Sequence, residues 1–526
     1  FVTPTPTPIN TIINPSGSGP QDTEVTKIVT LASTIVNKHW DVHLSSSPSL
    51  ASLGPGIAYS RILRFRSGPD VPTPNSLTEC DICESWEYKD PVTYVFHIKN
   101  NVFWHDIYPV NGRRLIAGDI VFSLERQKEP GNPNALLLNS IKTIEAKSDN
   151  TVEITLTSPD SDFLINLANG LTKIVAPEVV SLNNNIKSGP VIGTGPWILE
   201  GTRNELGYFF KSNDKYHETG IPGLDRLEII TIQDEQTMVA AFLTNKVDLI
   251  ESPMERFTEI KKIRTGVSYL TYKETGRGIE FALNTSTYPL NDLAVRRAVF
   301  QALDPWDAIN NVWGGLGFVS SGLTVLEPSW ILPEEQLRLY LADEEKARET
   351  LQSLNIKSPV SFEITVADYG DRYLEYGDYL KEQLSNAGFQ ITTTVINPTD
   401  YPEEIWYKGN YQAFLGPIAP VSTPNMYLFS VIHSKGKWNT HKYQNLSLDL
   451  LIEKQLRLQN QRQRKDIVHE IQRDLLYNGV RFMPFTRVAT WVWWPNVKNF
   501  YPNMTANEYF HLARLTTGSG ADVNLK

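Results

Sequence analysis

The chain has 526 residues, of which 41% are hydrophobic and 21% charged, so a largely disordered chain is excluded. At about 150 residues per domain, this length predicts three to four units or two large lobes. The formal net charge is −10 and no dense run of Lys and Arg occurs, which argues against a nucleic-acid-binding protein. No stretch approaches the roughly 18 apolar residues that a membrane-spanning helix needs.

Residues 1–26 are rich in Pro, Thr, Ser and Gly and carry no charge before Asp22. Such a segment cannot bury a core and is predicted to be extended. The chain also begins without Met, which is typical of processing. We interpret the segment as the tether of an exported, lipid-anchored protein, with an ordinary disordered tail as the alternative.

Strand patterns dominate the first half of the chain. Apolar and β-branched runs or alternating patterns predict strands at residues 27–34, 92–99, 141–146, 151–157 and 226–232. Between them, residues 119–127 show helical spacing, and Asp119 is predicted to be the N-cap of this helix.

The second half contains longer helical patterns. Helices are predicted at residues 291–303, 343–354, 371–387, 448–459 and 461–477, the third of them closed by Gly388, and strands at 361–367 and 390–396. Because strands and helices recur on both sides of about residue 280, we expect two α/β lobes.

The only cysteines, Cys80 and Cys83, form a lone C-x-x-C motif. No second pair completes a tetrahedral zinc site, and no βαβ pattern surrounds the motif. We interpret them as small, half-buried residues without a redox or metal role. Whether a disulfide joins them stays open, since so short a loop is strained.

Five segments carry recognisable motifs in a fixed order: residues 84–106 (ESWEYKDPVTYVFHIKNNVFWHD), 191–199 (VIGTGPWIL), 223–250, 281–305 and 442–455. In this order they resemble the family 5 extracellular solute-binding proteins, the peptide- and nickel-type receptors of ABC importers. The resemblance runs from about Lys27 to Phe500. It departs from the family pattern in an insertion after His105-Asp106 and in the sequence Ala302-Leu303-Asp304-Pro305.

The resemblance implies an α/β, two-lobed periplasmic-binding-protein-like fold (type II, cluster C-like) with an extra subdomain in lobe I. Lobe I is expected to comprise residues 27–56, 190–281 and 481–526, with 57–189 as its subdomain and 282–480 as lobe II. The chain is expected to cross between lobes near residues 276–284 and 484–490. Gly276 and Gly278 suit such crossings because they absorb backbone rotation.

The resemblance also implies function: capture of a solute, such as a peptide, an oligosaccharide or another organic compound, in the cleft between the lobes, and delivery to an ABC permease. The protein is expected in the periplasm or on the extracellular face of the cytoplasmic membrane. Side chains expected to line the cleft are Tyr59, Tyr369, Arg372, Trp406, Tyr427, Trp438 and Trp491, with Arg372 pairing a ligand carboxylate.

One departure concerns the ligand. In peptide-binding relatives an Asp within the segment that corresponds to residues 411–429 pairs the ligand's α-ammonium, whereas residues 405–448 of this chain contain four Lys and no acid. A buried ammonium without a carboxylate is costly. We therefore expect ordinary peptides to bind weakly and a neutral or anionic solute to bind better. The alternative is that Asp368 or Asp371 supplies the missing carboxylate.

Other candidate sites are weaker. Histidines at 39 and 43 with Asp41, and His433 with His441, have metal-ligand spacing, but neither set is expected to hold a metal. The turn at residues 193–196 lacks the Lys of a phosphate-binding loop and is interpreted as structural. No nucleophile or metalloprotease motif occurs, so we expect neither catalysis nor a cofactor. The rival function is a structural or sensory cell-surface protein that keeps the fold without transport; a hydrolase ranks third.

Overall fold

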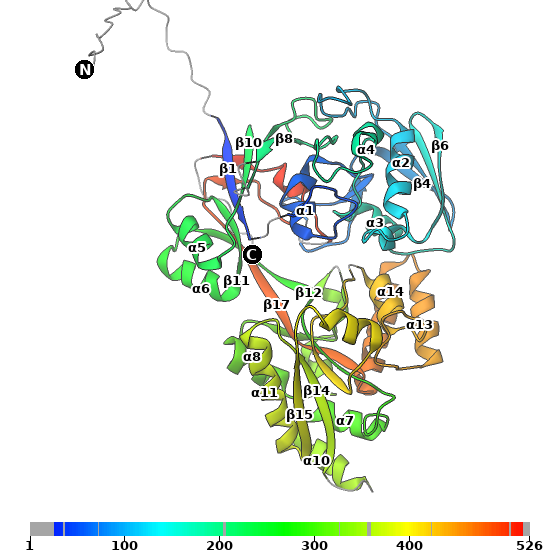
Figure 1. Cartoon of the computed structure of the whole chain (residues 1–526), viewed down its shortest axis with the longest axis vertical. Coiled ribbons are helices and arrows are strands. Elements are labelled where there is room, and N and C mark those ends of the chain that lie inside the picture. Colours follow the sequence, from blue (N-terminus) through cyan, green and yellow to red (C-terminus); the bar gives the residue numbers. More distant parts are fainter. Residues whose placement is uncertain are drawn as a thin grey trace, which may run out of the picture.

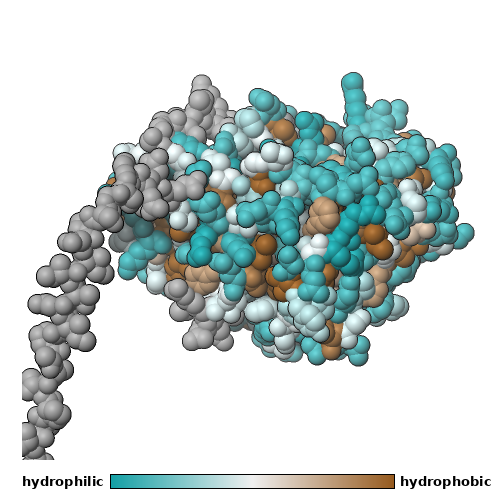
Figure 2. Space-filling view, turned by 90° about the horizontal axis from the view of Figure 1, so that it is seen from above, coloured by the Kyte–Doolittle hydropathy of each residue, from teal (hydrophilic) through white to brown (hydrophobic). Residues whose placement is uncertain are grey.

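A computed structural model of the chain describes residues 26–34, 37–71, 73–202, 207–325, 327–354, 359–421, 423–503 and 506–518. All but the last residue of the predicted tether lies outside these ranges. Within them, no helix is long and apolar enough to cross a membrane. On the face shown in Figure 2, hydrophilic side chains predominate and apolar ones form small groups.

Eleven strands form the large sheet, which extends through both halves of the molecule. β12 (Ser268–Leu283) and β17 (Arg481–Trp493) are its longest strands, and β13 (Phe318–Ser320) pairs with β17. Apart from β13, the strands follow one another across the sheet in the order β15 (Phe389–Ile396), β14 (Val360–Ala367), β16 (Ala413–Gly416), β12, β17, β11 (Leu249–Pro253), β1 (Ile28–Ser33), β10 (Arg226–Thr231), β9 (Gly207–Ser212) and β8 (Trp197–Thr202).

β12 and β17 connect the upper and lower parts of the molecule (Figure 1). They pair antiparallel, with a register shift between Lys273 and Gly278. Both segments where the sequence predicts a crossing lie along these strands. The two halves therefore do not have separate sheets, because hydrogen bonding continues from one half to the other through the crossing strands.

A second, four-stranded antiparallel sheet lies in the upper part, in the order β4 (Cys83–Asp90), β5 (Thr93–Ile98), β7 (Thr151–Leu156) and β6 (Ile141–Ser148). Helix α2 (Ala117–Lys128) packs against β6. A disulfide between Cys80 and Cys83 joins β3 (Thr78–Cys80), which pairs with β2 (Leu63–Phe65), to β4. The sequence did not decide whether these two cysteines form a disulfide, and in the structure they do.

Helices cover these sheets in two groups. Among the described residues, most buried apolar side chains between Val42 and Ile192 form one core, and those between Ile279 and Phe482 divide among three. The first group of helices is α1 (Pro48–Ser52), α2, α3 (Phe163–Ala168), α4 (Pro177–Asn183), α5 (Glu235–Leu243) and α6 (Met254–Ile263). The second is α7 (Leu293–Ala302), α8 (Pro305–Trp313), α9 (Glu334–Leu337), α10 (Glu344–Ser353), α11 (Asp371–Asn386), α12 (Pro424–Tyr427), α13 (Leu446–Leu456) and α14 (Gln461–Tyr477).

The strands and helices predicted from the sequence are confirmed to within three residues at each end. One detail was wrong: Asp119 is not the N-cap of α2, which begins at Ala117. Asp119 lies in the first turn, where its carboxylate accepts a hydrogen bond from the Ile116 backbone N–H at 3.1 Å and pairs with Arg113. The side chain still stabilises the helix N-terminus, because it accepts a hydrogen bond from a backbone N–H that precedes the first turn.

Candidate functional site

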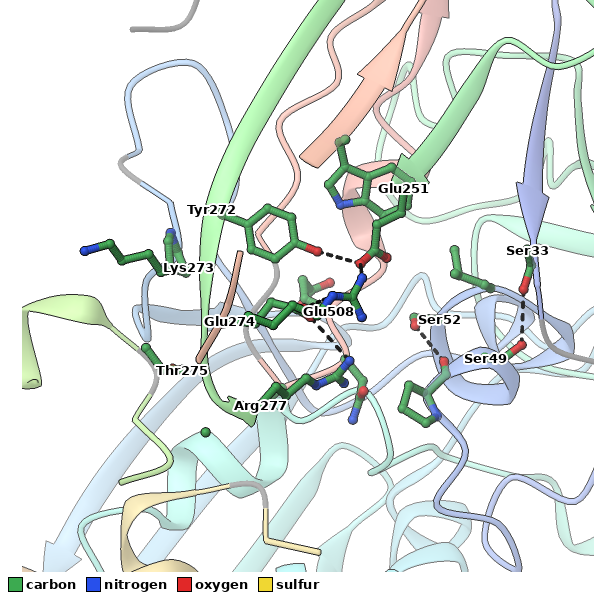
Figure 3. A pocket seen from close by; sticks show the side chains of 18 of the residues that line it. Ser33, Ser49, Ser52, Glu251, Tyr272, Lys273, Glu274, Thr275, Arg277 and Glu508 are labelled. Atoms are coloured by element: carbon green, nitrogen blue, oxygen red, sulfur yellow. Dashed lines mark hydrogen bonds and ion pairs between the residues drawn. The ribbon is translucent and has the colours of Figure 1, made fainter. Parts of the chain in front are cut away.

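A cavity of about 350 Å³, the hinge cavity, lies where β12 and β17 pass between the two halves. Residues from the upper part, such as Ser49 and Glu251, line one side, and Thr324 and Val421 from the lower part line the other. Tyr272 and its neighbours on β12 form a wall between them (Figure 3). A cavity of this size, bounded by both halves, suits a small-molecule ligand.

Four charged side chains of alternating sign form a network in this cavity (Figure 3). Arg487 Nε lies 2.9 Å from Glu274 Oε2, and its Nη2 lies 3.6 Å from Glu251 Oε1. Arg277 Nη1 lies 3.4 Å from Glu274 Oε1, and the Tyr272 hydroxyl donates to Glu251 Oε1 at 2.8 Å. Both acids of the network therefore have partners within the protein, and a charged ligand that binds to the network must exchange with one of these contacts.

Burial and charge act in opposite directions on this network. Burial raises the pKa of the Glu274 carboxyl and outweighs the opposite effect of Arg487 and Arg277. For Arg487, burial acts to lower the pKa, but Glu274 and Glu251 outweigh it and the pKa is raised. The guanidinium therefore remains charged, whereas the Glu274 carboxylate is held only by its two Arg partners.

The backbone of β12 explains how Arg277 meets Glu274. Side chains alternate along a strand, so Tyr272 and Glu274 share a face, and Arg277 would point the other way in regular geometry. Gly276 has a φ of +73°, within the register shift between Lys273 and Gly278, and the break brings Arg277 to the face of Glu274. A Cβ at Gly276 would lie 2.5 Å from Thr324 Oγ1, so only glycine fits this close approach.

The seven side chains expected in the cleft do not line one cavity, although Tyr427 and Trp438 share a buried cluster against which Trp406 packs. Trp491 lines the hinge cavity, and the other six are not among its described lining residues. Two of them hydrogen-bond elsewhere: the Tyr427 hydroxyl donates to Glu280 at 3.3 Å, and Trp406 Nε1 donates to the Pro417 carbonyl at 3.3 Å. Arg372 donates to the Val312 carbonyl, at the end of α8.

The remaining three are held by other contacts. Tyr59 is buried, and its carbonyl accepts a hydrogen bond from the Tyr509 hydroxyl at 2.7 Å. Tyr369 packs edge-on against Tyr401, and Trp438 is buried beneath the Lys437 ammonium. Ligand contact through these side chains stays a prediction.

The histidine clusters have structural partners. Asp41 Oδ2 pairs with Arg126 Nη2 at 2.6 Å, and His43 Nε2 lies 2.9 Å from the Lys173 carbonyl. Burial lowers the pKa of His43 to about 4 and that of His441 well below its usual value. His433 lies 3.4 Å from Glu453, outside the described lining of the hinge cavity.

The charged network was not among the predicted site residues. Residues 272–278 (YKETGRG) place Glu274 before Gly276 and Arg277 between Gly276 and Gly278, where a crossing was predicted. Charged side chains next to glycines at a predicted crossing were the available signal. Glu251 and Arg487 lie on other strands, and only their pairing with β12 and with each other in the folded chain makes them part of the site.

Comparison with known proteins adds family evidence. The family model of the bacterial extracellular solute-binding proteins, family 5 Middle, matches residues 79–440. The heme-binding protein A of Haemophilus influenzae is 23% identical over 457 residues, covering 81% of each chain. The dipeptide-binding protein of Escherichia coli is 26% identical over 329 residues, covering 58% of this chain and 59% of that protein.

Solved structures show the fold. HbpA2 of Haemophilus parasuis matches with a TM-score of 0.78 at 20% identity, covering 94% of this chain and all of that one. The ABC transporter substrate-binding protein CtaP of Listeria monocytogenes matches with a TM-score of 0.76 at 19% identity, covering 94% and 99%. The α/β, two-lobed periplasmic-binding-protein-like fold that the sequence implied is therefore confirmed.

Proposed function

Since the chain belongs to the bacterial extracellular solute-binding proteins of family 5, which are substrate-binding proteins and not enzymes, we propose that it captures a small solute in the hinge cavity and delivers it to an ABC permease. The observation that carries the proposal is the network of Glu251, Arg487, Glu274 and Arg277 in a cavity lined by both halves. The family works outside the cytoplasm, in the periplasm or extracellular space.

A solute in this cavity would touch both halves. Glu251 and Arg487 face it from one side, and Thr324 and Val421 from the other. A ligand that binds the closed arrangement better than the open one shifts the equilibrium toward closure. The crossing strands supply the hinge, because Gly276 and the register shift around it allow the backbone to rotate there.

We propose an anionic solute over a peptide on the two guanidinium groups of the network, although the described lining as a whole holds four acids (Glu235, Glu251, Glu274 and Glu508) and three cations (Lys273, Arg277 and Arg487). The acid-free segment, residues 405–448, contributes only Val421 to the described lining. Asp368 and Asp371 are not among the described lining residues, so they support no relocated anchor. A peptide ammonium that approaches Glu274 competes with two guanidinium groups. An anion, in contrast, forms ion pairs with Arg277 and Arg487 when it displaces Glu274. The raised pKa of Glu274 makes protonation of the displaced carboxylate easier.

Two experiments test the proposal. Mass spectrometry of material released by denaturing the purified protein is expected to reveal a bound solute that carries a negative charge. Calorimetry with tri-alanine is expected to show no binding at micromolar peptide concentration. Micromolar binding that is abolished by N-acetylation of the peptide would overturn the proposed solute class. Failure to find any solute, with natural extracts or with compound panels, would favour a structural or sensory protein that keeps this fold.

We also propose that residues 1–26 tether the protein to the outer face of the cytoplasmic membrane, next to its permease, by a lipid. The support is the Pro- and Thr-rich composition without charge before Asp22. Protein from its native membranes is expected to enter the detergent phase on Triton X-114 partition. Recovery in the aqueous phase would contradict lipid attachment.

A further inference from the structure

A second cavity, the seam cavity, lies between the subdomain and the lower half and has a volume of about 390 Å³. Figure 1 shows α3 above α13 and α14 in this region. Ser140, Thr157 and Asn166 line it from the subdomain, and Thr423 and Phe429 line it from the lower half. None of the described lining residues is shared with the hinge cavity, so this is a separate site.

A buried polar network holds the two sides of the seam cavity together. Asn425 donates from its backbone N–H to Asp162 Oδ2 at 2.7 Å and from its side chain to Asp160 Oδ1 at 2.8 Å. Ser161 donates from its backbone N–H to the Leu456 carbonyl at 2.8 Å. Behind them, Arg464 donates to Asn425 Oδ1 at 2.9 Å. The wall is therefore built from fixed groups of both halves and is not a chance hollow between mobile side chains.

The lining offers mostly neutral hydrogen-bonding groups. Eight of the fifteen lining residues that the structure describes carry a hydroxyl or an amide, and three are charged. One amide is unsatisfied: Asn166 is 4% exposed, and its Oδ1 accepts no hydrogen bond from a described residue. This oxygen is itself inaccessible to solvent, so it belongs to the wall of the cavity and is not a contact point for a ligand.

An aromatic surface completes the site. Phe429, in the π-helical turn Leu428–Ile432, is 44% exposed although it lines the cavity, and its ring packs on one side against His433 at 4.8 Å between ring centres. A flat apolar face next to many hydroxyl and amide groups matches a molecule that has an apolar face and a rim of hydroxyl groups.

We propose that the seam cavity binds a neutral polyhydroxylated compound of the size of a mono- or disaccharide. Its ring would stack on Phe429, and its hydroxyl groups would exchange hydrogen bonds with the exposed side chains of Asn139, Thr157 and Ser158. Asp160, Glu453 and Arg457 line the cavity, so a negative charge on the ligand would meet two carboxyl groups against one guanidinium. Because both halves line the site, its occupation stabilises their contact.

The test is saturation-transfer NMR on the full chain with a panel of neutral sugars: glucose, galactose, mannose, maltose, lactose and trehalose. At least one sugar is expected to bind, and its 6-phosphate or uronate analogue is expected to bind at least tenfold more weakly. Phe429→Ala is expected to weaken sugar binding at least tenfold. Tyr407→Ala, which removes an exposed ring outside both cavities, is the matched control and is expected to leave the affinity unchanged.

A second variant keeps the test decisive if Phe429→Ala fails to fold. Ser158 is exposed at the rim of the cavity, so Ser158→Trp fills the entrance without disturbing the core, and it is expected to abolish sugar binding. The proposal is overturned if no sugar of the panel binds, if binding survives Ser158→Trp, or if Arg487→Gln removes it, since the last result would place the sugar in the hinge cavity. Neither variant alters the hinge cavity, so solute binding there is scored independently.

Discussion

Asp162 and Arg464 form an ion pair, with 2.5 Å between Oδ1 and Nη2, in which neither side chain is exposed to solvent. Asp162 precedes α3 in the upper part and Arg464 lies in α14 in the lower part, so the pair joins the two halves away from the crossing strands (Figure 1). Opening of the molecule at this point must separate two charges that are buried together. The contact is therefore favourable only while both partners are present.

Arg464→Met is expected to lower the free energy of unfolding by about 3–5 kcal/mol, because it leaves the Asp162 carboxylate buried without its cation. Urea denaturation measures the change. The control is Arg348→Gln, which removes a surface pair with Glu344 and is expected to cost less than about 1 kcal/mol. Equal decreases in unfolding free energy for the two variants would show that the buried pair stabilises the fold no more than the surface pair does.

Arg487→Gln is expected to weaken binding of the anionic solute at least tenfold, because the hinge cavity loses a cation in contact with both Glu251 and Glu274. Calorimetry with the solute identified by mass spectrometry provides the measurement, and Arg348→Gln again serves as the control. Unchanged affinity with an intact fold would remove the network from the binding site.

Stability is expected to fall as the pH is lowered from about 6.5 toward 4. Burial lowers the pKa of His43, His105 and His511 to about 4 each, whereas in the unfolded chain it is near 6.5. Between these values the unfolded chain binds protons that the folded chain does not, so the free energy of unfolding decreases as the pH falls.

His105 allows a direct check of this pH dependence. Its Nε2 lies 3.0 Å from the Gly195 carbonyl and its Nδ1 accepts from the Gly193 N–H at 3.3 Å, which defines a neutral ring. His105→Asn is expected to reduce the slope of unfolding free energy against pH between pH 6.5 and 4. An unchanged slope in urea titrations at several pH values would contradict the assignment.

Gly193→Ala is expected to destabilise the protein by about 1–3 kcal/mol, because a Cβ there would lie 1.9 Å from the Ala58 carbonyl oxygen, a backbone atom that cannot move aside freely. Gly201→Ala is the matched control, since a Cβ at Gly201 meets no atom within 4 Å. Thermal unfolding of both variants decides the matter, and similar melting temperatures would refute the structural role of this turn.

Replacement of Cys80 and Cys83 by Ser is expected to leave solute affinity unchanged, because neither cysteine lines either cavity. The loop that the disulfide closes is short, so loop-closure entropy predicts a loss of about 2 kcal/mol in unfolding free energy. Calorimetry and denaturation of the same variant measure both. A large loss of affinity in a folded variant would reveal a role in binding.

The sequence by itself determined part of the secondary structure and the family fold. Hydrophobic periodicity is local, so it located α14 (Gln461–Tyr477) at its observed bounds and the other predicted helices and strands within three residues of theirs. Family motifs from residues 84–106 to 442–455 then implied the two-lobed architecture. The two predicted crossings came from the same resemblance, and glycines at 276 and 278 mark only the first of them in the sequence.

Tertiary structure alone decided which side chains meet. Glu251, Glu274 and Arg487 lie on three different strands, and their contact depends on the antiparallel register of β17 with β11 and β12. Asp162 and Arg464 are brought together only when the subdomain packs on α14. Pairing of distant charges depends on the position and burial of both partners, which no local pattern encodes. Aromatic residues such as Tyr427 are equally suited to a core and to a ligand cleft, so the sequence does not distinguish the two.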